Sequence, residues 1–389
     1  MLRIRRKEGS ALRAAMADEA GSEFEIVPVF ADARLELVRL LREAANIEHA
    51  LLVQYLYAGF SVKERYRTLR GGPVNASGTL LGIAVQEMRH LARVNELLVA
   101  LGALPNLDRL DFPITSGVYP FKLELEPLTR TSVAKYVTAE APLHALDVGS
   151  APTDEERRFR EAVHAALGMD GINHIGSLYR TIIARLRQAV AAEPKLLPDL
   201  DRWLSVLEGI LGQGEEAHFR FFRSVFEATH PAFGGADVWR DPASDIFPSR
   251  PLPKNPSAFP STPGTISDPA ARDLAWLSDL HYWTVLALLH LGHTDQDSDP
   301  IGHAISHMVG CLYPLGLHLA DKNLGLPFDA LALNVGPGLN TAASRSWLAR
   351  LLSELRAVED RIGDALPTGG LDAYSRGIAA ETLNSLGGA

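Results

Sequence analysis

The sequence predicts an all-α protein in which a four-helix bundle is followed by a long proline-rich arm and additional C-terminal helices. Three observations carry this prediction. Apolar residues recur every three to four positions over long segments, the alternating pattern typical of strands is scarce, and nine prolines fall within residues 231–269. Because proline lacks the backbone donor that a helix interior needs, we expect residues 231–269 to form an arm between two helical regions.

The predicted elements follow one another with few interruptions. We expect residues 1–30 to be a flexible N-terminal segment, 31–230 the bundle, 231–269 the arm, and 270–389 a helical region packing on the bundle. Pro142 is expected to stop or kink the third helix, and Gly102 suits the end of the second. Helices are expected at residues 31–61, 77–101, 129–141, 150–192 with a break at 168–171, 198–228, 269–291, 300–324 and 343–366, and a short strand at 121–125.

Composition narrows the class of protein. With 47% hydrophobic and 22% charged residues in 389, the chain has the balance of a soluble globular protein. A net charge of −9 without a basic block argues against nucleic acid or an anionic membrane as a partner. The single cysteine, Cys311, excludes an internal disulfide, and no run reaches the roughly 18 apolar residues of a membrane span. We therefore expect a cytoplasmic protein.

Ionisable residues within the apolar stripes are the informative feature. Glu87 and His90 lie three positions apart on the apolar face of one predicted helix, and Glu215 and His218 repeat this spacing on another. A spacing of three places a carboxylate and an imidazole on the same helix face. Because a buried carboxylate is costly without a positive partner, metal ions are the expected partners.

Two single carboxylates complete the pattern. Glu48 and Glu140 lie on the apolar lines of the two remaining helices. The resulting order of Glu, Glu-x-x-His, Glu, Glu-x-x-His is the ligand arrangement of a di-metal helical bundle, and its mixed donors suit iron or manganese. The alternative is a set of carboxylate–histidine hydrogen bonds that hold the helices in register, but it leaves four buried glutamates with only two histidines. We expect two metal ions, with Glu87 or Glu215 as the bridging and catalytic ligands, bound by Glu48, Glu87, His90, Glu140, Glu215 and His218.

Several segments around these residues carry a family resemblance. They are Ile47–Ala50, Gln54–Tyr57, Gln86–Leu91, Asn95–Leu98, Leu101-Gly102, Ala139–Pro142, Ile175–Tyr179 and Gln213–Glu216. Through them the chain resembles the ferritin-like domain of the iminophenyl-pyruvate dimer synthases of the violacein, rebeccamycin and staurosporine pathways, over residues 31–230 and weakly after 270. The resemblance implies a metal-dependent oxidative enzyme acting on amino-acid-derived imines. It also leaves haem open, for which no ligand maps onto this chain. Asn173-His174 departs from the resemblance, with His174 an extra ligand or a bundle histidine.

Other reactive residues have simpler interpretations. His303 and His307 share a helix face, but no glutamate or cysteine accompanies them at ligand spacing, and Cys311 lies in an apolar stretch that predicts a core position. The tyrosines near the predicted ligands are expected to pack in the core, although one hydroxyl is a candidate donor to a metal-bound oxygen. These are Tyr55, Tyr57, Tyr136 and Tyr179.

Together the residues and the resemblance predict a non-haem di-iron oxidase or oxygenase. Its expected partners are a small-molecule substrate and O2, and the sequence leaves a homo-oligomer open. The alternative is a non-catalytic ferritin-like module that binds or stores iron. The sequence after residue 230 favours the enzyme, because a storage shell does not need it.

Overall fold

A computed structural model describes most of the chain. The described residues are 3–6, 24–73, 78–108, 110–115, 119–168, 176–330, 341–363, 366 and 371–386. They divide into two compact units, each assembled from separate stretches of sequence. Unit 1 comprises Met1–Ile47, Ile114–Leu123 and Leu128–Pro248, and unit 2 comprises Glu48–Pro113, Glu124–Pro127 and Ser249–Ala389.

Unit 1 is mainly helical and holds the short strands of the described chain. Helix α1 (Ala33–Ser61) begins in it and continues into unit 2. Strands β1 and β2 pair antiparallel, with Arg3 opposite Val27, and β3 and β4 pair likewise, with Ile114 opposite Leu123. Its other elements are β1 (Arg3–Arg6), β2 (Phe24–Val27), β3 (Ile114–Thr115), β4 (Lys122–Leu123), α4 (Arg130–Glu140), η2 (Val148–Ser150), α5 (Asp154–Leu167), α6 (Gly176–Ala192), α7 (Leu200–Gln213), η3 (Gly214–His218), α8 (Phe219–Phe226) and η4 (Pro231–Phe233).

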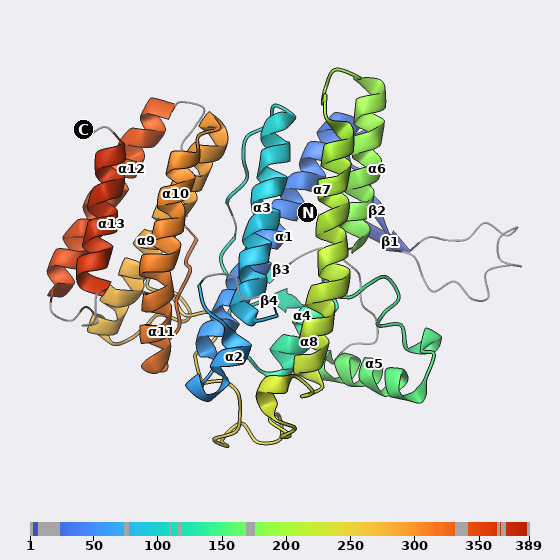
Figure 1. The fold of residues 1–389 in the computed structure, drawn as a ribbon, viewed down its shortest axis with the longest axis horizontal. Coiled ribbons are helices and arrows are strands. Elements are labelled where there is room, and N and C mark those ends of the chain that lie inside the picture. The colour runs from blue at the N-terminus through green and yellow to red at the C-terminus, as the bar shows by residue number, and fades with distance from the viewer. Residues whose placement is uncertain are drawn as a thin grey trace, which may run out of the picture. The chain divides into compact units, whose positions relative to one another are not determined.

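Unit 2 contains the longest C-terminal helices. Figure 1 shows α9 and α10 beside each other, with α12 and α13 packed next to them. In addition to the second half of α1, its elements are η1 (Glu64–Tyr66), α2 (Arg67–Arg70), α3 (Leu80–Ala100), α9 (Pro269–Asp295), α10 (Ser298–His307), η5 (Met308–Leu312), α11 (Tyr313–Asp321), α12 (Thr341–Ile362) and α13 (Leu371–Ser385). Helix α13 was not predicted from the sequence.

Hydroxyl and carboxylate side chains cap the N-termini of three helices at the positions that the sequence indicates. Thr79 accepts a hydrogen bond from the Gly82 amide and caps α3. Thr129 caps α4, and its partner Ser132 completes a reciprocal pair of capping bonds. Asp268 caps α9 immediately before a proline at the first helical position. The predicted starts of these helices are thereby confirmed to within a few residues.

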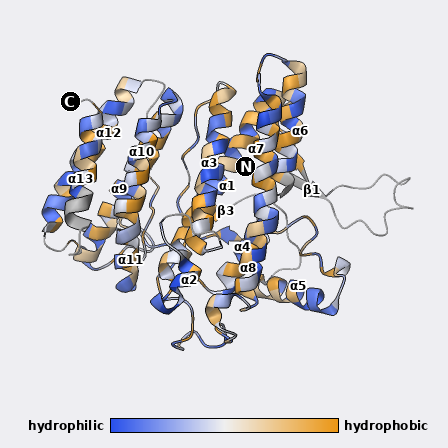
Figure 2. Ribbon diagram, in the orientation of Figure 1, coloured by the Kyte–Doolittle hydropathy of each residue, from blue (hydrophilic) through white to orange (hydrophobic). Residues whose placement is uncertain are grey.

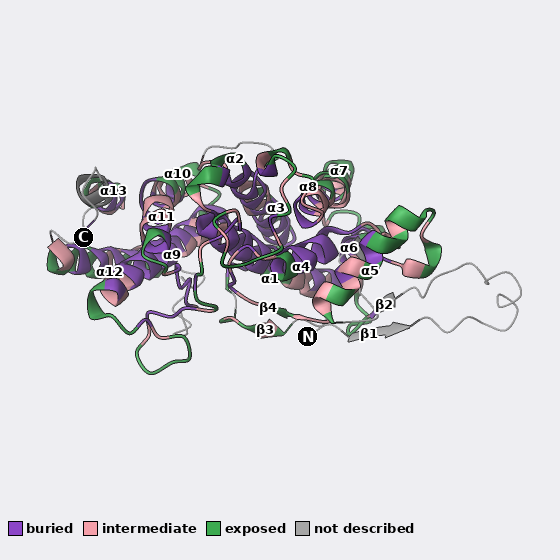
Figure 3. Cartoon of the chain, turned by 90° about the horizontal axis from the view of Figure 1, so that it is seen from below, coloured by how far each residue is buried: buried purple, intermediate pink, exposed green. Residues whose placement is uncertain are grey.

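Burial follows the apolar stripes. Helices α1, α3 and α9 are buried along most of their length, whereas α5 is largely exposed or half-buried (Figure 3). Hydrophilic and hydrophobic residues alternate around α5 and α12, as expected for helices with one buried face (Figure 2). No helix in the described part of the chain is long and apolar enough to span a membrane.

Two helices contain a widened, π-helical turn that the sequence analysis did not predict. The turn η3 joins α7 to α8, and the turn η5 joins α10 to α11. Such turns are rare in proteins and occur often at functional sites. Both carry residues with metal-binding side chains, because Glu215 and His218 lie in η3 and Cys311 lies in η5.

The second part of the arm is ordered by backbone and side-chain hydrogen bonds. Asn255 donates its amide to the Leu125 carbonyl at 2.9 Å and accepts from the Leu125 amide through its side chain at 2.8 Å. Arg250 donates to the Val62 carbonyl at 2.8 Å, and its own amide donates to Ser61. These bonds replace the helical hydrogen bonds that the prolines prevent.

Candidate metal centre

Glu48, Glu87 and His90 form a buried cluster within unit 2. The His90 Nδ1 atom lies 2.9 Å from a Glu87 carboxylate oxygen and 3.7 Å from a Glu48 carboxylate oxygen. Each of the three residues is 6% exposed or less. One ligand atom from each lies within 4.8 Å of the others, which is the spacing of a shared ion. Mixed carboxylate and imidazole donors suit iron or manganese.

Helix geometry explains how the sequence produces this cluster. Glu87 and His90 are separated by three positions on α3, and both lie on the face that also buries Leu91 and Val94. Glu48 projects from α1 among core residues that include Leu51. The apolar stripes that bury the two helices therefore carry the three polar side chains into the interior.

The electrostatics of the cluster favour a positive charge. Burial, and after it the charge of the neighbouring Glu87, raise the pKa of Glu48 to about 8 against the opposing effect of His90. Burial lowers the pKa of His90, but the charges and hydrogen bonds of Glu87 and Glu48 outweigh burial and hold this pKa well above its usual value. Two carboxylates thus share one imidazole, and a bound cation would satisfy both of them.

A second pair of predicted ligands meets within unit 1. The His218 Nδ1 atom lies 3.5 Å from a Glu140 carboxylate oxygen, and both side chains are buried. Glu140 ends α4, and His218 ends the π-helical turn η3. A Cβ atom at Gly214 would lie 3.0 Å from the same Glu140 oxygen, so the glycine leaves room for this carboxylate.

Glu215 takes a different position from the one expected. Its two carboxylate oxygens accept hydrogen bonds from Arg180 Nη2 at 2.8 and 3.0 Å, and its side chain is 19% exposed. Glu215 belongs to none of the clusters of metal-binding side chains found among the described residues. The physical reason is the π-helical turn, which changes the rotation per residue and separates the directions of Glu215 and His218. The role of Glu215 as a metal ligand and bridge stays a prediction. The binding of the same two metal ions by all six residues also stays a prediction.

The predicted tyrosines are buried, and their surroundings are those of core residues. The Tyr57 hydroxyl donates to the Pro253 carbonyl at 2.5 Å, and the Tyr136 ring packs against Phe222 with ring centroids 5.3 Å apart. Tyr55 and Tyr179 are also buried. His174 and Asn173 lie outside the described residues.

One neighbour of the cluster is not among the metal ligands predicted from the sequence. His49, next to Glu48 on α1, shares a 2.7 Å hydrogen bond with the Tyr282 hydroxyl of α9. The two residues are 233 positions apart, so no local pattern indicates their contact. This bond links the helix that carries Glu48 to α9 within unit 2.

Comparison with known proteins bears on the fold and the family. Residues 41–199 match the family model named Ferritin-like. Dichlorochromopyrrolate synthase from Lentzea aerocolonigenes is 26% identical to the chain over 391 residues, which cover 84% of this chain and 38% of the relative. This chain thus spans less than half the length of that relative. A crystal structure of a ferritin-like protein from Caulobacter vibrioides has a TM-score of 0.49 and 19% identity, covering 78% of this chain and 99% of that one. The helical structure and the region matched by the family model confirm an all-α, ferritin-like fold. The similarity to this synthase confirms the resemblance to the dimer synthase group.

Proposed function

We propose that this protein is a ferritin-like, iron- or manganese-dependent oxidoreductase of secondary metabolism. It uses O2 and acts on a small, imine-like molecule derived from an amino acid. The observation that carries the proposal is the buried Glu48–Glu87–His90 cluster, whose charge and donor types suit such a metal ion. The related synthase supports an enzyme of this general class, and the substrate class rests on the resemblance.

Two sets of residues, one in each unit, are each proposed to hold a metal ion. Glu48, Glu87 and His90 form one set, and Glu140 with His218 forms the other. Iron or manganese bound there would supply electron transfer with O2 and a positive charge that orients a substrate. Each set would contribute imidazole nitrogen, carboxylate oxygen and surroundings from which water is largely excluded, since each of the five residues is 6% exposed or less.

Iron storage is the competing function. A storage site must load and release iron without a substrate, and it has no need of the helices α9 to α13. Hydrogen bonds of Asn255 and Arg250 hold the arm against the rest of unit 2. An arm fixed in this way is better suited to shaping a substrate site than a loosely attached extension would be. We therefore place the enzyme first, with haem left without an assigned ligand.

Metal binding by defined variants tests the proposal. The metal-free protein is prepared without oxygen and titrated with ferrous iron, and bound iron per chain is measured for the wild type and for Glu87→Ala and His218→Ala. We expect each variant to lose at least tenfold in affinity, because each loses a ligand. Glu96→Ala is the matched control, since Glu96 lies on the same helix but pairs with Arg93 on the surface. Equal iron content in all four proteins would refute the ligand assignment.

Oxygen consumption separates the two functions. Air is admitted to the iron-loaded protein with and without candidate amino-acid-derived imines, and O2 uptake is recorded over many equivalents. Uptake that continues only with a substrate supports the enzyme. Uptake that stops once the bound iron is oxidised, whatever small molecule is present, supports storage.

A further inference from the structure

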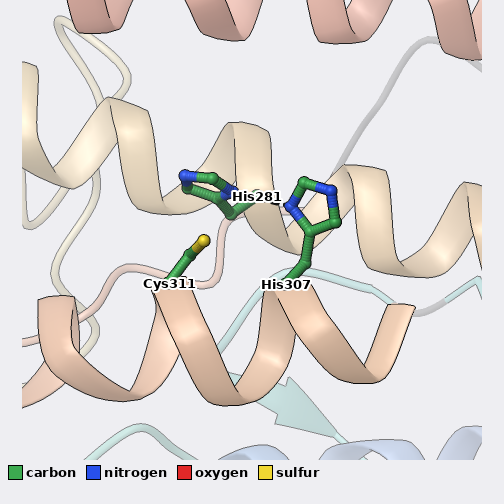
Figure 4. A group of neighbouring side chains, drawn as sticks. All are labelled: His281, His307 and Cys311. Atoms are coloured by element: carbon green, nitrogen blue, oxygen red, sulfur yellow. Dashed lines mark hydrogen bonds between the residues drawn. The ribbon is translucent and has the colours of Figure 1, made fainter. Parts of the chain in front are cut away.

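A second cluster of metal-binding side chains lies in unit 2, away from the glutamate-rich set in sequence and chemistry. It consists of His281 on α9, His307 at the end of α10 and Cys311 in the π-helical turn η5. One ligand atom from each lies within 4.8 Å of the others, and all three side chains are fully buried. Figure 4 shows the Cys311 sulfur directed toward the His281 ring, with the His307 ring beside it.

The hydrogen bonds around His307 determine which of its nitrogens is free to bind. Thr382 donates its hydroxyl proton to the Ile378 carbonyl at 2.8 Å, so its oxygen accepts from His307 Nε2 at 3.1 Å. With its proton on Nε2, His307 presents the lone pair of Nδ1 to the interior. That atom lies 2.9 Å from Nδ1 of His281.

A buried carboxylate lies beside His281. Glu359 on α12 is fully buried, and one of its carboxylate oxygens lies 3.9 Å from His281 Nε2, which is longer than a hydrogen bond. Histidines that bind metals usually direct the other ring nitrogen to a carboxylate or hydroxyl oxygen, which fixes the ring and its tautomer. The outer nitrogen of His307 is bonded to such an oxygen and that of His281 has one nearby, while the two inner nitrogens face one another.

The charges of the cluster suit a divalent ion with soft and borderline ligands. His281 and His307 are both fully buried, which favours the neutral imidazole, the form that binds a metal ion. A Cys311 thiolate and a Glu359 carboxylate together balance two positive charges. This balance matters because an isolated charge in such an interior is costly.

We propose that His281, His307 and Cys311 bind a thiophilic transition-metal ion, specifically Zn²⁺, with Glu359 as the carboxylate that balances its charge. Zinc binds imidazole nitrogen at about 2.0–2.1 Å and thiolate sulfur at about 2.3 Å. Two nitrogens on one tetrahedral zinc ion then lie roughly 3.4 Å apart, so the rings need to separate by only about half an ångström. The three residues leave the fourth position of a tetrahedral zinc ion open, and the bound ion would tie α9 to the α10–α11 segment.

The competing interpretation is a histidine pair in an ordinary core, with Cys311 as an inert neighbour. In that case one Nδ1 donates to the other and no ion is required. The pair alone does not account for a fully buried carboxylate, Glu359, near His281 or for a thiol in a widened helical turn that lies close to both rings. A metal ion accounts for all four residues together.

Metal titration with matched variants tests the proposal. The purified metal-free full-length protein is titrated with Zn²⁺ and separately with Co²⁺, whose absorption reports thiolate bonding. We expect one tightly bound zinc ion per chain, a sulfur-to-cobalt charge-transfer band, and a loss of at least tenfold in zinc affinity for Cys311→Ser and His307→Ala. His318→Ala, a histidine of α11 outside the cluster, should retain the wild-type affinity.

The outcomes are decisive even if a variant fails to fold. The cobalt spectrum of the wild-type protein is sufficient to test the proposal. If the sulfur-to-cobalt charge-transfer band is absent, the proposal is wrong. Unchanged zinc affinity in a folded Cys311→Ser protein also overturns it. The test is independent of the proposed oxidoreductase, since Glu87→Ala should lose iron and keep zinc, whereas Cys311→Ser should lose zinc and keep iron.

Discussion

Replacing Gly325 with alanine should destabilise unit 2 by forcing Tyr57 out of its place. A Cβ atom at position 325 would lie 2.1 Å from the Tyr57 hydroxyl oxygen and 2.3 and 2.4 Å from two ring carbons. Ordinary van der Waals contact begins at 3.4 Å, so the gap between 2.1 and 3.4 Å requires the ring to move by 1.3 Å. The ring is completely buried on the part of α1 that follows Glu48.

The cost follows from two losses. Overpacking in a close-packed interior typically costs about 1–3 kcal/mol. Moving the ring also breaks the 2.5 Å hydrogen bond from the Tyr57 hydroxyl to the Pro253 carbonyl, which is worth about 1 kcal/mol. We expect Gly325→Ala to lower the free energy of unfolding by about 2–4 kcal/mol. Tyr57→Phe, which removes only the hydrogen bond, should lower it by about 1 kcal/mol.

Urea unfolding followed by circular dichroism measures these changes. Gly302→Ala is the control, because position 302 lies in α10 and a Cβ atom there would meet no atom within 4 Å. Alanine at that exposed helical position should stabilise the protein by up to about 1 kcal/mol. A Gly325→Ala protein within about 0.5 kcal/mol of the wild type would refute the packing argument.

Two further predictions concern local structure. Burial raises the pKa of Glu36, but hydrogen bonds from Arg39 and from the Phe30 and Val29 amides outweigh it and hold the pKa below its usual 4.5. Glu36→Gln should therefore cost about 1–2 kcal/mol above pH 5, and the difference from the wild type should shrink as pH falls toward 3, measured by urea unfolding across pH. Gly264→Ala should lower the melting temperature markedly, because φ is +82° there and a Cβ atom would lie 2.1 Å from a backbone oxygen; an equal melting temperature would contradict this.

The positions of the helices and the polar residues on their buried faces could be predicted from the sequence. Thr129 and Pro142 bracket α4, and the structure places α4 at Arg130–Glu140. The spacing of Glu87 and His90 correctly predicted their contact, because three residues along an α-helix return to the same face. Local patterns of this kind succeed when the backbone is regular.

The remaining features depend on irregular backbone or on distant pairing. The direction of Glu215 depends on a π-helical turn, and no residue in Gly214–His218 marks such a turn in advance. From the sequence, Cys311 is expected to be inert core and His307 to lack a cysteine at ligand spacing. Cys311 is buried as expected, but it follows His307 by four positions, and the structure brings both residues together with His281 of another helix. Long-range contacts of this type have no signal in a single sequence.

The widened turn η3 holds about one residue more than an ordinary α-helical turn, because its hydrogen bonds span five residues and not four. Deleting one residue within Gly214–His218 should therefore turn this segment into regular α-helix and leave the phase of α8 nearly unchanged. Phe222 and Val225 would stay in the interior, and the side chains of the turn itself would change direction. A single-residue deletion is expected to be better tolerated here than within the regular part of α7 or α8, where it would rotate the following residues by about 100°.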